Sequence, residues 1–294
     1  MQPKGYSDFK TIQFMVILSV VCAVILSILA ALLAEPKELA KDLDRSKQMM
    51  IAAKIFSPEG YFIIRDSEGK LTPSIFENGI LKPSTKIKPA SNKEILEIYN
   101  KRLIPFLTND QGEIKSFQEI GMDEAKYLSE YKKLGYYRAP WKLFYEILPN
   151  VENPEKEKPI GYVIPVNGFG LWDAIYGYIA IEPDANTIIG ISWYDQKETP
   201  GLGANITEEP WQNLFPGKKI FLESPNGSTD FISAPIGITV VKGKVAEVYG
   251  DSPKAKSAVD GMAGATLTGN GVTDAYKQVL SAYRPLLLKL QNKK

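Results

Sequence analysis

An uninterrupted apolar run near the N-terminus constrains this chain more than any other feature of the sequence. Residues 14–34 read FMVILSVVCAVILSILAALLA and contain no charged residue, proline or glycine. At the helical rise of about 1.5 Å per residue, such a run spans about 30 Å, the thickness of a bilayer's hydrocarbon core. The sequence therefore predicts one transmembrane helix over 14–34, with a short tail over 1–13 before it and the soluble bulk of the chain after it.

A cleaved signal peptide is the competing interpretation of this run. Its apolar segment is usually about 7–15 residues long and ends in a small-x-small site. Here the run is longer, and Leu32 stands two residues before Ala34, where a small residue is expected. Cys22 follows Val21 in the middle of the run, which is not the context of a lipid-modified cysteine. We therefore favour an uncleaved anchor in the lipid bilayer.

The charges beside the run leave its orientation open. Two lysines precede it, and the basic residues that follow it are Lys37, Lys41, Arg45 and Lys47. Taken literally, the positive-inside rule would place the C-terminal bulk of the chain inside the cell. Acidic residues are mixed with these positions, however, and large domains translocate regardless of flanking charge. The charge count alone does not decide the side.

The composition excludes several classes of chemistry. The chain has 294 residues, a formal net charge of +1, no histidine, and one cysteine, which lies inside the apolar run. It therefore cannot by itself form a structural zinc site, a thiolate-held iron–sulfur cluster, a His-ligated haem or a Ser-His-Asp triad, and we expect no metal site. The balanced charge gives no reason to expect nucleic acid as a partner. Redox chemistry in this chain would need an organic cofactor.

The soluble part divides into three stretches. Residues 35–58 have the apolar spacing of an amphipathic helix, which we expect to be a stalk packed on the domain. Residues 59–150 mix strand-like and helix-like segments without a chemical motif, and we expect an insertion-rich part of the soluble domain. The charged segment NVENPEKEKP then reads as a solvated loop. Residues 151–294 are expected to form the functional domain.

This last stretch reads as strands followed by a terminal helix. Strand-like segments lie at 161–166, 175–182, 187–194 and 231–241, and EPDAN between the second and third predicts an antiparallel hairpin. From Val272 onward, apolar residues recur every three or four positions, which predicts a helix that Pro285 should bend or end. Because no regular βαβ alternation occurs, the predicted fold class is α+β, with a mixed or antiparallel sheet and flanking helices.

Three glycine-bearing loops punctuate the same stretch: NGFGLWD at 167–173, QKETPGLGAN at 196–205 and DGMAGATLTGNGV at 260–272. In the third, glycines let the backbone approach a ligand, and Thr268 or Asn270 is expected to cap the helix that follows. The unsatisfied N–H groups at the start of a helix are a natural seat for a phosphate. The loop matches neither the P-loop nor the G-x-G-x-x-G pattern. On its own it is either a turn that starts a helix or a phosphate site.

The third loop also resembles a known motif. DGMAGAT is similar to the flavinylation motif D-G-x-[ST]-G-A-T of the FMN-binding domain family, in which the last threonine carries FMN as a phosphoester installed by a flavin transferase that uses FAD. The matching residues are Asp260, Gly261, Gly264, Ala265 and Thr266. Ala263 stands where the family usually has Ser or Thr. Because the attachment residue is present, we expect the modification to occur.

Two further signatures of the family occur in the expected order. ETPGLG spans residues 198–203, and GLW at 170–172 is followed by YGYIAI at 176–181. Three ordered signatures behind one N-terminal span resemble the C subunits of sodium-translocating NADH:quinone oxidoreductases, with the G subunits of Rnf electron-transport complexes as the near alternative. The resemblance extends over about residues 160–280 and the anchor, and is weak over 59–150.

The resemblance implies a role for each candidate residue. Thr266 would carry FMN covalently, and the loop glycines with the helix N-terminus would seat its phosphate. Trp172 would lie against the isoalloxazine ring with Leu202 closing the other side, while Glu198 and Thr199 would hydrogen-bond its polar edge. Taken singly, Trp172 is more often a core residue, and Glu198 a solvated or capping carboxylate. Asp260 is expected to shape the turn or serve the transferase rather than touch the flavin.

The function implied is that of an electron-transfer subunit, with no complete active site in this chain. Electrons would reach FMN from an iron–sulfur centre held by membrane partners and pass to another flavin and then to quinone, coupled to sodium transport. The resemblance implies a bacterial inner-membrane protein with its soluble domain on the periplasmic side. The alternatives are the Rnf subunit and a membrane-anchored module that binds flavin or phosphate reversibly, for which denaturation would release the ligand. A scaffold domain without a cofactor would leave the three loops unexplained.

Overall fold

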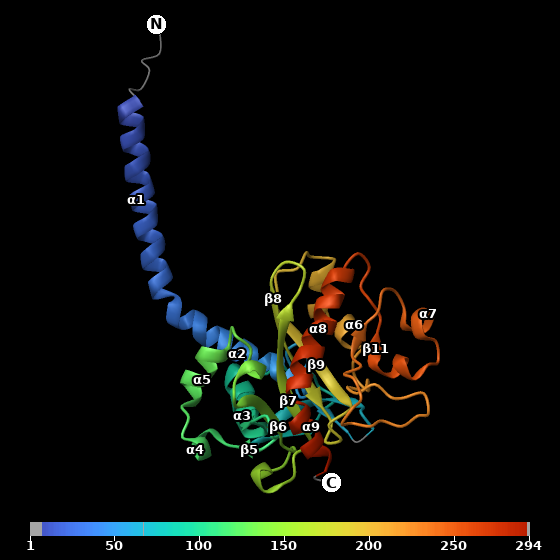
Figure 1. The fold of residues 1–294 in the computed structure, drawn as a ribbon. Coiled ribbons are helices and arrows are strands. Elements are labelled where there is room, and N and C mark those ends of the chain that lie inside the picture. Colours follow the sequence, from blue (N-terminus) through green and yellow to red (C-terminus); the bar gives the residue numbers. More distant parts are fainter. Residues whose placement is uncertain (1–7, 67, 293–294) are drawn as a thin grey trace. The chain divides into compact units, whose positions relative to one another are not determined.

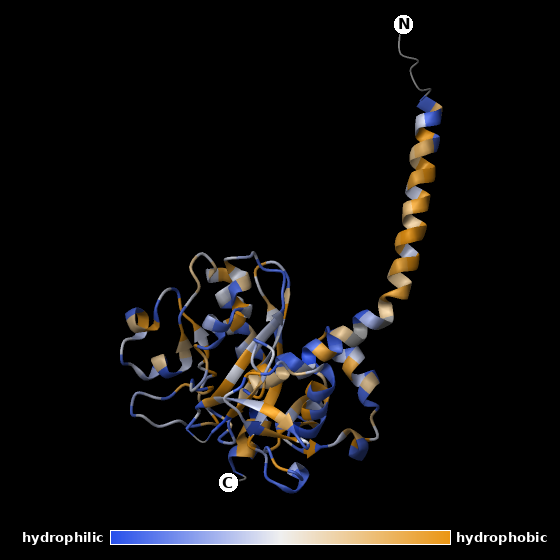
Figure 2. Cartoon of the chain, turned by 180° about the vertical axis from the view of Figure 1, so that it is seen from behind, coloured by the Kyte–Doolittle hydropathy of each residue, from blue (hydrophilic) through white to orange (hydrophobic). Residues whose placement is uncertain are grey.

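The computed structural model describes residues 8–66 and 68–292, and the chain divides into two units between Arg45 and Ser46. The first unit contains α1 (Asp8–Leu32) and the start of α2 (Ala34–Ala52). Within the described residues, α1 is the helix that is long and apolar enough to cross a membrane, and none of its side chains is buried (Figures 1 and 2). It begins six residues before the predicted span, and residues 1–7 of the predicted tail lie outside the described part.

The second unit is built on one antiparallel sheet with strand order β5-β4-β6-β7-β8-β9. Strand β7 pairs with β6 and β8, and β8 pairs in turn with β9 across the expected hairpin turn at residues 182–186. The strands are β4 (Leu103–Thr108), β5 (Ile114–Lys115), β6 (Lys142–Ile147), β7 (Gly161–Phe169), β8 (Ala174–Ile181) and β9 (Ile188–Asp195). The first three come from the region 59–150, which therefore shares its sheet with the C-terminal part of the chain.

Helices cover both faces of this sheet. On one face lie α8 (Thr266–Ala282) and α9 (Arg284–Gln291), whose apolar side chains form the main core with those of β7, β8 and β9 (Figure 1). On the other face, α3 (Asn92–Arg102) packs beside β4, and the C-terminal end of α2 reaches β9, where Ser192 donates a hydrogen bond to Gln48. The break between α8 and α9 falls beside Pro285, as the sequence predicts.

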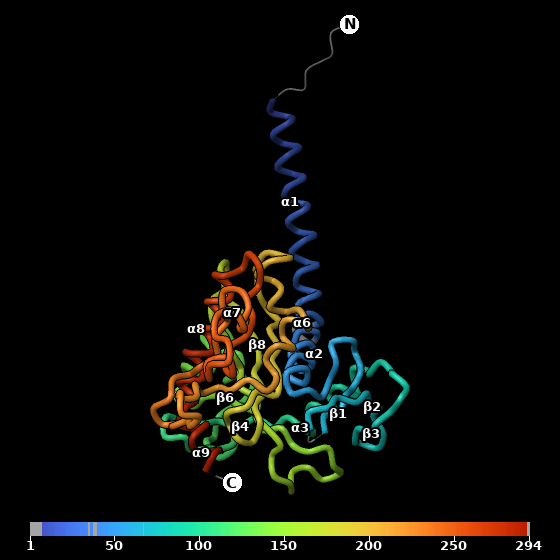
Figure 3. The backbone as a smooth tube through the Cα atoms, turned by 90° about the vertical axis from the view of Figure 1, so that its right-hand side faces the viewer, coloured from blue at the N-terminus to red at the C-terminus, as the bar shows by residue number. Residues whose placement is uncertain are grey.

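Smaller elements complete the unit. A three-stranded antiparallel sheet, β1-β2-β3, lies apart from the large sheet in Figure 3. The short helices are α4, α5, α6 and α7 (Phe117–Ile120, Glu124–Tyr131, Glu209–Gln212 and Val245–Tyr249), and the 3-10 turns are η1 to η4 (Tyr136–Arg138, Pro154–Lys156, Gly203–Thr207 and Pro253–Ser257). The remaining strands are β1 (Phe62–Arg65), β2 (Leu71–Glu77), β3 (Ile80–Pro83), β10 (Thr239–Val240) and β11 (Ala258–Val259). The α+β class predicted from the sequence is confirmed.

One predicted strand is largely absent. Residues 231–241 contribute only the two-residue β10, which pairs in parallel with β11, and a single bridge at Ile236. The guanidinium of Arg284 donates to the carbonyl oxygens of Phe231, Ile232 and Ala234, so these groups are satisfied by a side chain rather than by a neighbouring strand. Pro235 also removes a backbone donor from the segment. Residues 231–241 are thus held as a loop by the Arg284 side chain.

Candidate functional site

The first glycine-bearing loop joins β7 to β8 as a tight hairpin. Within it the N–H of Gly170 donates to the carbonyl of Asp173 at 2.9 Å, and the carboxylate of Asp173 is bonded to Lys197 and to the N–H of Ala174. The bond from Lys197 is the main reason that the pKa of Asp173 is lowered. This turn presents Trp172 with 67% of its surface exposed. The alternative interpretation of Trp172 as a core residue is therefore wrong.

The second loop leads from β9 into η3. Gly201 has a φ of +76°, a left-handed conformation that favours glycine, and the N–H groups of Leu202 and Ala204 donate to the carbonyl of Thr199. The hydroxyl of Thr199 accepts a hydrogen bond from the Trp172 indole N–H at 3.1 Å. The second loop therefore orients the tryptophan ring that the first loop presents.

The third loop turns into α8 at Gly264, whose φ is +72°. The helix starts at Thr266, and its N-cap is Ala265, which has no side-chain hydrogen bond to offer. The expected caps were wrong: Thr268 and Asn270 both lie inside the helix. Among the described residues, no hydrogen-bond partner occurs for the N–H groups of Thr266, Leu267 and Thr268. These donors are open to an acceptor from outside the chain.

Close backbone contacts fix α8 against the end of β7. A Cβ at Gly271 would lie 2.1 Å from the carbonyl oxygen of Phe169, and a Cβ at Gly168 would lie 2.5 Å from the Cβ of Ala275. Real Cβ atoms do not approach other atoms so closely, so glycine is required at both places. The contact brings the N-terminal turn of α8 beside the Trp172 loop.

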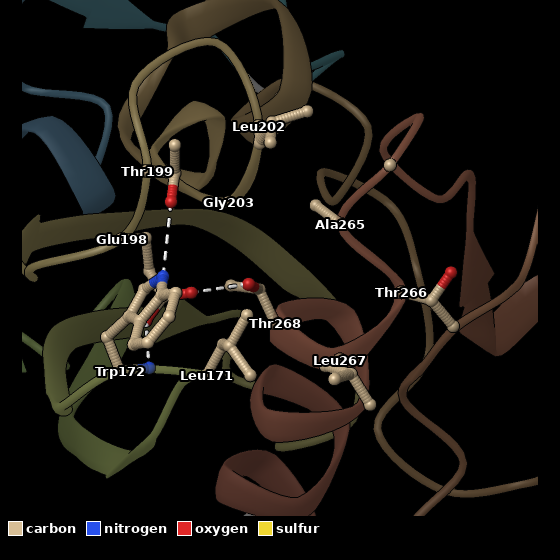
Figure 4. A pocket seen from close by; sticks show the side chains of 11 residues that line it. Leu171, Trp172, Glu198, Thr199, Leu202, Gly203, Ala265, Thr266, Leu267 and Thr268 are labelled. Carbon is tan, nitrogen blue, oxygen red and sulfur yellow. Dashed lines mark hydrogen bonds between the residues drawn. The ribbon is translucent and has the colours of Figure 1, made fainter.

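The three loops enclose one pocket, shown in Figure 4. Its volume is about 200 Å³. Thr266 is exposed and lies on the opposite side of this pocket from Trp172 and Thr199 (Figure 4). The lining residues are Leu171, Trp172, Glu198, Thr199, Leu202, Gly203, Gly264, Ala265, Thr266, Leu267 and Thr268. Eight of these eleven are among the ten site residues expected from the sequence.

Two of the expected site residues lie outside the lining. The carboxylate of Asp260 accepts hydrogen bonds from the N–H of Val245 at 2.8 Å and from Lys244 at 2.9 Å, and the bond from Val245 is the main reason that its pKa is lowered. Gly261 sits where a Cβ would lie 2.1 Å from the carbonyl oxygen of Val241. Both residues therefore hold the third loop against residues 241–245.

Three lining residues were not among the expected ones: Leu171, Gly203 and Leu267. The first two stand within the quoted signatures, so their place beside Trp172 and Leu202 was the available signal. Leu267 follows Thr266 directly and stands within the quoted loop DGMAGATLTGNGV, but it was not singled out. With 47%, 41% and 59% of their surfaces exposed, Leu171, Leu202 and Leu267 add to Trp172 an apolar rim around the pocket. Clustered exposed apolar side chains are typical of a binding site.

The lining fits a flavin nucleotide. An aromatic ring and leucine side chains offer apolar surface to a planar ring system, while the open N–H groups at the start of α8 and the Thr266 hydroxyl offer donors to a phosphate. Pockets that bury most of a small-molecule ligand usually measure about 300–1,000 Å³. At about 200 Å³ this pocket would hold part of such a molecule and leave the remainder exposed.

Comparison with known proteins agrees with this fit. The chain matches the FMN-binding domain family over residues 170–281. It is 40% identical to the C subunit of the Na⁺-translocating NADH-quinone reductase of Chlamydia caviae, with 98% of this chain and 94% of that protein covered. The chain belongs to the family of the C subunits of Na⁺-translocating NADH-quinone reductases. Within the family, the Vibrio campbellii protein is 31% identical over 96% of this chain and 95% of that protein.

A solved structure of the family has the same fold. The crystal structure of the C subunit from Parabacteroides distasonis superposes with a TM-score of 0.53 at 26% identity, covering 87% of this chain and 96% of that one. The family resemblance drawn from the three signatures is thereby confirmed, as is the presence of an FMN-binding domain.

Proposed function

We propose that this chain is the flavin-carrying electron-transfer subunit of a Na⁺-translocating NADH-quinone reductase, with FMN bound covalently through Thr266. The observation that carries the proposal is the position of Thr266: its hydroxyl is exposed, at the first residue of α8, on the edge of the pocket. A modifying enzyme can therefore reach the hydroxyl while the attached group reaches the pocket. Membership of the C-subunit family supports the proposal.

The attachment is a phosphoryl transfer. The oxygen of the Thr266 hydroxyl would bond to the FMN phosphorus of FAD, the bond to the AMP portion would break, and the hydroxyl proton would leave to solvent. A flavin transferase would bind the FAD and catalyse the exchange. The resulting phosphodiester keeps one negative charge, and the unsatisfied N–H groups of the first turn of α8 would stabilise it.

The residues of this chain would hold the flavin rather than react with it. Trp172 and Leu202 supply apolar surface for the ring, and Thr199 keeps the indole in place through its hydrogen bond. Bound FMN would supply the redox chemistry, accepting and donating electrons, and the protein supplies position and electrostatics. A covalent link suits a carrier because the group cannot dissociate between turnovers. The shallow pocket would leave the flavin accessible to partner redox groups.

Membership of the same family also supports a proposal for the membrane and the partners. We propose that α1 anchors the chain in the bacterial inner membrane, with the soluble unit on the periplasmic side. Because the chain has no histidine and its only cysteine, Cys22, lies in α1, other subunits of the complex would supply the iron–sulfur centre and further flavins. Sodium transport would be a property of the assembled complex.

Denaturing electrophoresis tests the covalent link. The full chain is co-expressed with a flavin transferase, separated in SDS, and the gel is examined for flavin fluorescence before staining. The wild-type band should fluoresce, and the Thr266→Ala band should be dark. Thr85→Ala is the matched control, since Thr85 is exposed and lies outside the pocket. A dark wild-type band beside a fluorescent reference flavoprotein would refute covalent attachment and leave reversible binding as the alternative.

A further inference from the structure

The carboxylate of Glu198 joins the first loop to α8. One oxygen, Oε1, accepts the backbone N–H of Trp172 at 3.0 Å, and the other, Oε2, accepts the hydroxyl of Thr268 at 2.5 Å. The first partner belongs to the β7–β8 hairpin and the second to the first turn of α8, while Glu198 itself belongs to the loop that follows β9. One side chain therefore links all three segments that line the pocket (Figure 4).

Two glycines make room for this carboxylate. A Cβ at Gly170 would lie 2.3 Å from Oε1 of Glu198, and a Cβ at Gly203 would lie 2.7 Å from Oε2. Neither glycine has a positive φ, so backbone conformation does not explain them. Glycine is needed at both positions because the Glu198 side chain occupies the space that a methyl group would fill.

The carboxylate is buried without a cation. Glu198 is only 5% exposed, and within the described chain no lysine or arginine forms an ion pair with it. A buried charge normally needs hydrogen bonds or a counter-ion. Here hydrogen bonds alone stabilise it, and the side chain forms part of the pocket wall. Its negative charge therefore acts on whatever group the pocket holds.

We propose that Glu198 is the positioning residue of the flavin site: it fixes the Trp172 loop to the start of α8, and its charge lowers the reduction potential of the flavin. The second half rests on the proposed function, because it needs a flavin in the pocket. A negative charge on the pocket wall opposes the uptake of electrons by the bound group. The positioning half acts through Trp172 and Thr268, and the charge half acts through space. Neither half requires a direct hydrogen bond from Glu198 to the ring.

The positioning half is tested on the full chain without flavin, in a Thr266→Ala background. Hydrogen–deuterium exchange is measured at the Trp172 amide and in the first turn of α8. Glu198→Ala should speed exchange at Trp172 by about tenfold or more, as expected for losing one hydrogen bond to a charged acceptor. Glu198→Gln should restore slow exchange, because its amide oxygen still accepts that N–H and its NH₂ still reaches Thr268. Unchanged exchange in Glu198→Ala would overturn the positioning role.

The charge half is tested on the flavinylated protein by redox titration. Glu198→Gln keeps the geometry and removes the charge, so its midpoint potential should be more positive than that of the wild type. Glu155→Gln, which removes an exposed charge in η2, should leave the potential unchanged. An unshifted potential in Glu198→Gln would overturn the role of the charge. Should no flavin be attached to the wild type, the proposed function fails, while the exchange experiment still decides the positioning role.

Discussion

Replacing Gly203 with alanine should destabilise the protein although it adds only one methyl group. That methyl would lie 2.4 Å from the Thr268 hydroxyl oxygen and 2.7 Å from Oε2 of Glu198, the two atoms that share a hydrogen bond. Ordinary contact distances are nearly 1 Å longer. The two side chains would therefore have to separate, or the loop that carries Gly203 would have to move away from α8.

The loss of stability can be estimated for each response, the separation of the two side chains and the movement of the loop. Losing a hydrogen bond to a charged group costs about 1.5–3 kcal/mol, and forcing an extra methylene into a packed site costs about 1–3 kcal/mol. Breaking the hydrogen bond would relieve the crowding, and moving the loop would keep the hydrogen bond, so the two costs do not add in full. We therefore expect the free energy of unfolding to fall by about 3 kcal/mol. For a folded unit of this size, about 1 kcal/mol lowers the melting temperature by roughly 2–4 °C. Gly203→Ala should therefore melt about 6–12 °C below the wild type.

The assay is thermal unfolding of the full chain in detergent, followed by tryptophan fluorescence. A single scan rate is used, because apparent midpoints of irreversible unfolding depend on it. Gly201→Ala is the matched control, because a methyl group at this position of the same loop would meet open space. Its only cost is the strain of a non-glycine residue at positive φ, about 1–2 kcal/mol. A second test repeats Gly203→Ala in a Thr268→Ala background, where the penalty should shrink. If Gly203→Ala melts no lower than Gly201→Ala, the close approach of Glu198 and Thr268 to Gly203 is refuted.

Three further predictions concern other parts of the molecule. The N–H of Val245 lowers the pKa of Asp260 below its unfolded value of 3.8, so the ionised carboxylate stabilises the fold at pH values above 3.8. Asp260→Asn should therefore lower the free energy of unfolding, measured with denaturant at pH 7. This difference from the wild type should disappear as the pH falls through the folded pKa of Asp260. Leu280→Ala, in the fully buried face of α8, should cost about 2–5 kcal/mol in the same measurement, whereas Leu134→Ala, at an exposed position, should cost under about 0.5 kcal/mol. Ala263→Ser, also exposed, should leave the melting temperature unchanged, and a shift of several degrees would contradict its placement.

Local patterns account for the parts of the fold that the sequence predicts. The apolar run gives α1, the turn EPDAN gives the β8–β9 hairpin, and the three-and-four spacing with Pro285 gives α8 and its end. Each of these follows from contacts within a short stretch of chain. The same is true of the site loops, because eight of the eleven lining residues are among the site residues expected from the sequence.

Long-range contacts account for what the sequence does not predict. Segment 231–241 has the composition of a strand, but Arg284, some fifty residues away, takes its carbonyl groups. The helix α8 starts at Thr266, before Thr268, so the expected cap lies inside the helix, and the Thr268 hydroxyl donates to Glu198 from a distant loop. The burial of Glu198 likewise depends on Gly170 and Gly203, which come from two different loops.

The most direct test of the central claim is the mass of one tryptic peptide. Cleavage after Lys256 and Lys277 releases residues 257–277, which contain Thr266 together with Thr268 and Thr273. In protein matured with an active flavin transferase, this peptide should carry the mass of FMN less one water, and fragmentation should locate it on Thr266. An unmodified peptide from such protein, or a flavin located on another residue, would contradict the account.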